Sequence, residues 1–201
     1  MDELEKELVP ENEKGMQSDT ESEKKFTTEE EAKEFYLVAK SRLLQPNKWH
    51  EYAGKATADF QLTNEKGEPE QKEIREGFHF RIDIPGPGST TGEGYDWVKI
   101  EKIKEVENGD EKIVSIQVRP ATNPLNEKKD VAHFFSEEAT SSFMITLKGK
   151  KVKAGIYGRN EKPNTGADSL PDKARNAAIA TGAMGGLAKL QWKSLVNGLL
   201  S

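Results

Sequence analysis

The histidines and arginines of this sequence are its candidate catalytic or ligand-binding residues. His50 stands next to Glu51 and Trp49, and an imidazole beside a carboxylate can share a proton or bind a metal. Neighbouring side chains of a strand point to opposite faces, so any partner of His50 must come from elsewhere in the fold. One hypothesis is therefore an enzyme whose cavity contains His50, His133 and Arg159. The alternative is an exposed His50, a Trp49 that anchors a helix-to-sheet turn, and a hydrogen-bonded His133 in the core.

A metal or cofactor site is not expected. The three histidines are scattered without an HxH or a helical HxxxH pair, and the chain has no cysteine. Disulfides, cysteine-based zinc sites and thiol nucleophiles are thereby excluded. A Gly-x-Ser-x-Gly turn for a serine nucleophile is also missing. The sequence favours a non-catalytic protein with no cofactor.

Four arginines could hold a carboxylate through paired N–H groups. They are Arg81, Arg119, Arg159 and Arg175. If a sheet encloses a cavity, we predict that these four line it as polar ligand-binding residues, together with Trp49, His50 and His133. The alternative is structural, with Arg159 paired with Glu161 or Asp172.

Residues 85–94 form a loop rich in glycine and proline. Its glycines are Gly86, Gly88, Gly92 and Gly94. Successive glycines can let backbone N–H groups converge on an anion, but no Gly-Lys-Ser/Thr follows and two positions are proline. The pattern favours a hairpin connection or a gate over a pocket mouth, rather than a phosphate loop.

The charge of the chain is concentrated at its start. Residues 1–25 hold nine acids and four lysines, a net charge of −5, and the whole chain of 201 residues is also −5. The remainder is neutral, so it has no basic surplus for nucleic acid or an anionic membrane. Because residues 1–25 have few large apolar side chains, we predict a disordered acidic tail there and one domain over residues 26–201.

The rest of the chain has the periodicity of an α+β domain. A Thr-x-x-Glu start and an apolar stripe predict a helix at 28–45. Alternating apolar residues predict six mostly antiparallel strands, with a hairpin turn at Asn108-Gly109 and a bulge near Ile103. A long helix over 172–200 contains Gly182, Gly185 and Gly186, which predict a kink or a close contact. The strands are expected at 56–62, 78–84, 95–106, 113–118, 143–147 and 152–156.

This order of elements resembles the START-like helix-grip proteins, which include the polyketide-cyclase and birch-pollen-allergen types. The local match is strongest for the strand at 151–158 followed by the helix at 172–200. The resemblance implies a curved sheet that grips the last helix and an apolar or amphipathic ligand between them. One departure is that helix-grip domains open with a strand, for which Phe26 is the only apolar residue available here. A cystatin-like or nuclear-transport-factor-like fold is the alternative.

These observations predict a non-catalytic protein that binds a small amphipathic or carboxylate-bearing ligand between the sheet and the C-terminal helix. A protein-interaction module is the alternative, and the enzyme described above is a second one. The first residues lack the basic and apolar segments of a secretion signal, and no apolar stretch approaches the ~20 residues that span a bilayer. We therefore expect a cytoplasmic protein that binds neither a membrane nor nucleic acid.

Overall fold

The computed structural model describes residues 1–54, 58–71, 73–84, 88–166, 170–180 and 185–201. Within them, one antiparallel sheet of seven strands has the order β1-β7-β6-β5-β4-β3-β2. The strands are β1 (Met16–Lys25), β2 (Asp59–Thr63), β3 (His79–Asp83), β4 (Asp96–Asn108), β5 (Glu111–Pro120), β6 (Thr140–Lys148) and β7 (Lys151–Glu161). The helices are α1 (Glu3–Leu8), α2 (Glu29–Leu43), the short 3-10 helix η1 (Pro46–Lys48), α3 (Trp49–Ala53), α4 (Leu170–Ala180) and α5 (Gly185–Leu199).

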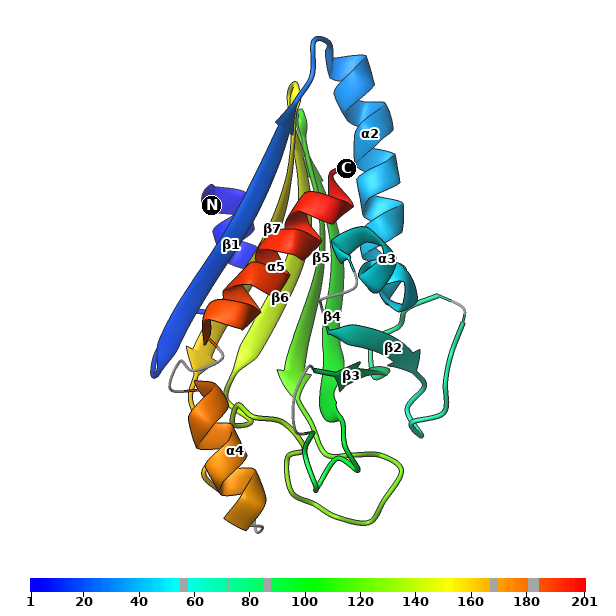
Figure 1. The fold of residues 1–201 in the computed structure, drawn as a ribbon. Coiled ribbons are helices and arrows are strands. Elements are labelled where there is room, and N and C mark those ends of the chain that lie inside the picture. The colour runs from blue at the N-terminus through cyan, green and yellow to red at the C-terminus, as the bar shows by residue number, and fades with distance from the viewer. Residues whose placement is uncertain (55–57, 72, 85–87, 167–169, 181–184) are drawn as a thin grey trace.

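The sheet curves around α5, with α2 and α3 beside that helix and α1 on the opposite face (Figure 1). The predicted α+β class and antiparallel sheet are confirmed. All six predicted strands are present, and the tight turns after β4 and β6 place Gly109 and Gly149 at positive φ. A register shift between Ile100 and Lys102 is the bulge expected in β4.

Helix α2 begins with the predicted capping box. Thr28 Oγ1 accepts a hydrogen bond from the Glu31 N–H at 3.2 Å, and Glu31 Oε2 accepts one from the Thr28 N–H at 3.1 Å. These bonds satisfy two of the N–H groups that have no partner inside the helix. Ala32, Tyr36 and Ala39 form the buried stripe of the helix.

The predicted disordered tail at residues 1–25 is wrong, because these residues form α1 and β1. β1 pairs along its length with β7, at one edge of the sheet. On the convex face its acids meet the bases of β7: the side-chain N–O distances are 2.6 Å for Asp19–Arg159, 3.3 Å for Glu21–Lys153 and 3.2 Å for Glu23–Lys151. The acidity that predicted disorder is therefore balanced by a distant basic strand, and the sheet has seven strands instead of six.

Small residues on the concave face of β1 leave space for α5. Thr20 is buried there opposite Ile156 of β7, and Lys193 of α5 donates a hydrogen bond from Nζ to the Glu21 carbonyl at 2.6 Å. A strand with hydroxyls on one face and charges on the other cannot be recognised from apolar alternation.

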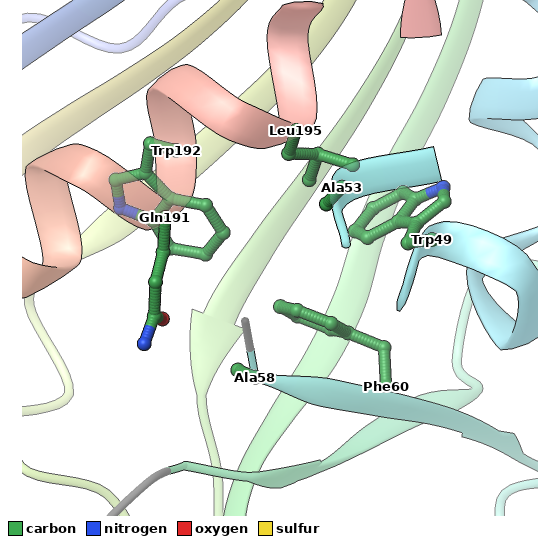
Figure 2. Close-up of a pocket in the computed structure, with 7 residues that line it drawn as sticks. All are labelled: Trp49, Ala53, Ala58, Phe60, Gln191, Trp192 and Leu195. Atoms are coloured by element: carbon green, nitrogen blue, oxygen red, sulfur yellow. The ribbon is translucent and has the colours of Figure 1, made fainter. Parts of the chain in front are cut away.

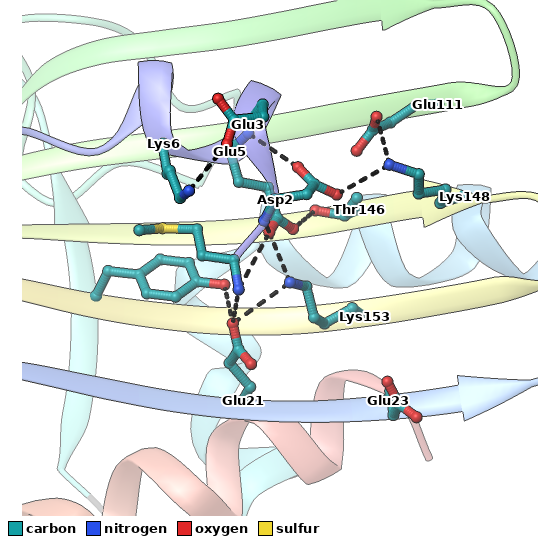
Figure 3. Close-up of polar contacts among 12 residues, drawn as sticks. Asp2, Glu3, Glu5, Lys6, Glu21, Glu23, Glu111, Thr146, Lys148 and Lys153 are labelled. Atoms are coloured by element: carbon teal, nitrogen blue, oxygen red, sulfur yellow. Dashed lines mark hydrogen bonds and ion pairs between the residues drawn. The ribbon is translucent and has the colours of Figure 1, made fainter.

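Helix α1 is fixed to the convex face through Glu5, which is buried. Its Oε1 accepts a hydrogen bond from Thr146 Oγ1 at 2.6 Å, and its Oε2 lies 2.6 Å from Lys153 Nζ (Figure 3). Apolar side chains complete the contact: Leu4, Leu8 and Val9 pack with Ile113, Met144 and Tyr157. An ion pair and a small apolar cluster thus give an ordered structure to a segment whose composition alone predicts disorder.

The predicted C-terminal helix is divided into α4 and α5. Residues 181–184, which include Gly182, lie outside the described residues. α5 lies across the concave face of the sheet, whereas α4 lies at its lower end in Figure 1. Gly198 lets α5 cross α3 closely, because a Cβ atom there would lie 2.1 Å from the Tyr52 carbonyl oxygen. The predicted packing of the last helix on the sheet is confirmed for α5. None of the described helices is long and apolar enough to cross a membrane.

Candidate ligand-binding cleft

Five aromatic side chains meet between α5 and the sheet. Trp49 is central, with ring centroids 5.0 Å from Phe60, 5.6 Å from Phe80 and 4.9 Å from Phe143. Trp192 of α5 closes the group, at 6.1 Å from Phe60 and 5.7 Å from Phe143. Aromatic pairs at these separations add to the stability gained from burial alone.

The two tryptophans are held differently. Trp49 is buried, and its Nε1–H points at the Arg42 and Leu43 carbonyl oxygens, each 3.2 Å away at the end of α2. Trp192 is half-buried, and its indole N–H makes no hydrogen bond within the described residues. Hydrogen bonds therefore fix the Trp49 ring in place, whereas Trp192 is held by packing without a hydrogen bond from its indole.

A narrow cleft lies beside this cluster, where α3, β2 and α5 meet (Figure 2). Its free volume is about 10 Å³, close to the least that one water molecule needs. The described lining is apolar apart from one amide: Trp49, Ala53, Ala58, Phe60, Gln191, Trp192 and Leu195. At this point, the described side chains of α3, β2 and α5 leave almost no free space.

Three of the four predicted arginines point away from this cleft. Arg81 alternates with the core residues Phe80 and Ile82, so its side chain is on the convex face, where it lies over the Tyr95 ring at 4.5 Å. Arg119 follows the core residue Val118, and Arg159 has the opposite parity to the core residues Ala154 and Ile156 of β7, so both side chains also lie on the convex face. Arg119 pairs with Glu101 at 2.6 Å and Arg159 with Asp19 at 2.6 Å, so the partner of Arg159 is neither Glu161 nor Asp172.

Arg175 and His133 come together at the lower end of the sheet, remote from the cleft lining. Arg175 of α4 binds both carboxylate oxygens of Asp96, and both side chains are buried. His133 is buried nearby, and its Nδ1 accepts a hydrogen bond from the Phe135 N–H at 3.0 Å. Burial lowers the pKa of His133 to about 4, with Asp96 raising it and Arg175 lowering it further. A neutral, buried imidazole of this kind is a structural acceptor.

The three residues of the enzyme hypothesis are not brought together. His50 is exposed on α3, with Nδ1 3.3 Å from Asp59 Oδ1 on β2. Arg159 lies on β7 next to β1, at the opposite edge of the sheet. His133 has the separate surroundings described above. These three side chains therefore lie in three different parts of the described structure.

The predicted gate loop lies beside α4. Gly86 is outside the described residues, and Gly88, Gly92 and Gly94 are not among the residues that line the cleft. Instead, the loop folds on itself and binds Asp172 of α4 through Thr90 and Thr91.

Of the predicted ligand-binding residues, only Trp49 is among the described residues that line the cleft. The other lining residues were not predicted as site residues: Ala53, Ala58, Phe60, Gln191, Trp192 and Leu195. The available signal was the apolar alternation of β2 together with the apolar face of the last helix, because both face the space between sheet and helix.

The order of elements along the chain decides the fold. β1 supplies the opening strand, two helices and six strands follow, and the last helix lies in the grip of the sheet. The chain has the helix-grip fold. The resemblance inferred from the sequence is thus confirmed, and the missing first strand is the polar segment at residues 16–25.

Comparisons with solved structures find chains that are similar to this one over most of its length. The hypothetical protein jhp0584 from Helicobacter pylori aligns over 96% of this chain and 92% of its own, with a TM-score of 0.50 and 13% identity. Norcoclaurine synthase from Thalictrum flavum aligns over 95% and 96%, with a TM-score of 0.41 and 9% identity. Human STARD10 aligns over 89% of this chain and 63% of its own, with a TM-score of 0.39 and 12% identity. No family model and no curated protein matches the helix-grip chain described here.

Proposed function

We propose that this protein binds a small, mostly apolar ligand in the cleft between α5 and the sheet. The observation that carries the proposal is the lining itself, in which aromatic and aliphatic side chains of three elements surround one amide, Gln191. Concave apolar sites with few polar groups are typical of small-molecule binding. Among the described lining residues there is no cation, which favours a neutral ligand over the carboxylate-bearing one predicted from the arginines.

Binding requires the cleft to open. A cavity that accepts benzene has a volume of about 150 Å³, far above the free volume of this cleft. Trp192 is the side chain whose movement would provide the space, because it lacks the hydrogen bonds that hold Trp49. The C-terminal end of α5 is fixed by Arg42, whose Nη1 donates to the Leu199 carbonyl at 3.2 Å and the Ser201 carbonyl at 2.7 Å. We therefore expect opening at Trp192 without release of the helix end.

The test is a titration with a neutral apolar fluorophore, N-phenyl-1-naphthylamine, against the wild-type protein and Trp192→Ala. We expect saturable binding by both and tighter binding by W192A, because truncation removes the side chain that fills the space. Leu190→Ala is the matched control on α5, since Leu190 is 65% exposed, and it should leave the affinity unchanged. Failure of both proteins to bind the probe, or an equal gain in L190A, would overturn the proposal.

A protein-interaction module is the second candidate. It is favoured by Leu37 and Val38, which are exposed on α2. Val38 also lines an open groove together with Phe26 and Phe35. Leu37→Glu should abolish complex formation with a protein partner but leave binding of the fluorophore unchanged. The two candidates therefore separate in one pair of measurements.

A further inference from the structure

The carboxylate of Asp172 is held by the loop before β4. Asp172 is 2% exposed. Its Oδ1 accepts a hydrogen bond from the Thr90 N–H at 2.8 Å. Its Oδ2 accepts three, from Thr90 Oγ1 at 2.6 Å, the Thr91 N–H at 3.1 Å and Thr91 Oγ1 at 2.9 Å. Two successive N–H groups and two hydroxyls that converge on one anion form a carboxylate-binding concavity.

The loop holds these donors in place through its own bonds. The Gly94 N–H donates to the Ser89 carbonyl at 2.7 Å, and the Gly92 N–H donates to Ser89 Oγ at 3.1 Å. Trp97 Nε1–H then fixes the Gly92 carbonyl at 3.3 Å. None of these bonds involves α4, so the residues on both sides of Thr90 and Thr91 are held without the helix.

The attachments of α4 that the structure describes are made by polar side chains. Among the side chains described at 171–178, the buried ones are Asp172, Arg175 and Asn176, whereas Ala174 and Ala178 are exposed. Asn176 Nδ2 donates to the Asn164 carbonyl at 3.0 Å. The hydrogen bonds that hold Asp172 can be accepted by another carboxylate in its place, whereas an apolar contact face has no competitor of that kind. A competing carboxylate can therefore take the place of Asp172 in the loop.

We propose that Thr90 and Thr91 form a carboxylate-binding site that Asp172 occupies, and that the carboxylate of a ligand can replace Asp172 and release α4. The site favours the ionised carboxylate over the protonated carboxylic acid of its ligand. Burial raises the pKa of Asp172, but the hydrogen bonds from Thr90 and Thr91 outweigh burial and hold that pKa below its usual value. This site shares no residue with the cleft under α5, so each proposal can fail alone.

Chemical rescue tests the proposal. Asp172→Ala removes the internal carboxylate and leaves the donors of the loop intact. We expect D172A to have a lower Tm than the wild type, and potassium acetate to recover most of that loss, whereas potassium chloride at the same ionic strength recovers none. In the ¹⁵N spectrum of D172A, acetate should shift the Thr90 and Thr91 amide signals in a saturable way.

The control is the double variant Asp172→Ala/Thr91→Val, which lacks one hydroxyl donor and should show no rescue. Equal rescue in both variants, or no rescue by acetate in D172A, would overturn the proposal. If D172A does not fold, hydrogen exchange of the α4 amides in the wild type decides instead. Acetate should then accelerate exchange relative to chloride, and an unchanged rate contradicts the proposal.

Discussion

At the scale of single residues, the structure explains why the candidate chemical groups are structural. Each predicted arginine contacts a carboxylate or an aromatic ring: Arg119 and Arg159 have acids within 2.6 Å, and Arg81 lies over Tyr95. Such contacts satisfy the charge of each arginine within the fold. The groups left for function are apolar side chains and hydroxyls.

His133 should make stability depend on pH. Burial lowers its pKa from 6.5 to about 4, so between these values the unfolded chain binds more protons than the folded one. The free energy of unfolding must therefore rise with pH through this window and fall as the pH drops toward 4. The difference amounts to at most about 3 kcal/mol. His133→Asn should flatten the slope in urea titrations between pH 4 and 6.5, and an unchanged slope would show that other groups cause it.

Glu5 should stabilise the fold much more than its neighbour Glu3. Glu5 is fully buried against Lys153 and Thr146, whereas the Glu3 side chain is 94% exposed. Hydrogen bonds to charged groups contribute about 1.5–3 kcal/mol, so we expect Glu5→Ala to lower the free energy of unfolding by about 2 kcal/mol. Glu3→Ala is the matched control and should change it by less than about 0.5 kcal/mol. Equal urea midpoints for the two variants would mean that α1 is detached in solution.

At the scale of elements, the sequence predicts the apolar strands well and the polar one not at all. β3 has Phe80 and Ile82 at every second position, and β6 has Phe143 and Ile145 in the same arrangement. These apolar faces predict both the strand and the side that packs on the core. β1 alternates hydroxyls with acids, and its partners on β7 are more than a hundred residues away in sequence. No local pattern contains that pairing.

The candidate site could be predicted only in part for a related reason. Trp49 stood out as an aromatic next to His50, but the arginines were placed by residue type alone. Alternation with core residues already places Arg81 on the convex face, because Phe80 and Ile82 take the concave one. The Thr90–Asp172 contact joins two segments that are distant in sequence, and only the fold brings them together.

The crossing of α5 over α3 should be sensitive to one methyl group. A Cβ at position 198 would lie 2.1 Å from the Tyr52 carbonyl oxygen, and backbone cannot yield as a flexible side chain does. We expect Gly198→Ala to destabilise the fold by about 1–3 kcal/mol, the usual cost of overpacking. Asn197→Ala, at an exposed neighbouring position, is the control. Thermal melts of both variants give the comparison, and an unchanged Tm for G198A would show that the helices can separate there.

At the scale of the whole molecule, residues 1–25 close the grip on α5. Deleting them should expose the edge of β7 and the apolar surface under α1, including Ile113 and Met144. Unpaired strand edges promote association. We expect the truncated chain to aggregate and to lose its sharp thermal transition, as measured by light scattering and circular dichroism. A monomeric, cooperatively melting product would contradict the role of β1.

The pairing of the first strand with the last one also has a consequence for biosynthesis. β1 leaves the ribosome early, yet β7 is translated only after β2 to β6. Until then, β1 has no strand to pair with, and its many charged residues give it little tendency to collapse onto the growing chain. The sheet can close only after translation has passed residue 161, so this protein should acquire its native structure late, and a pause before that point should leave a nascent chain open to chaperones.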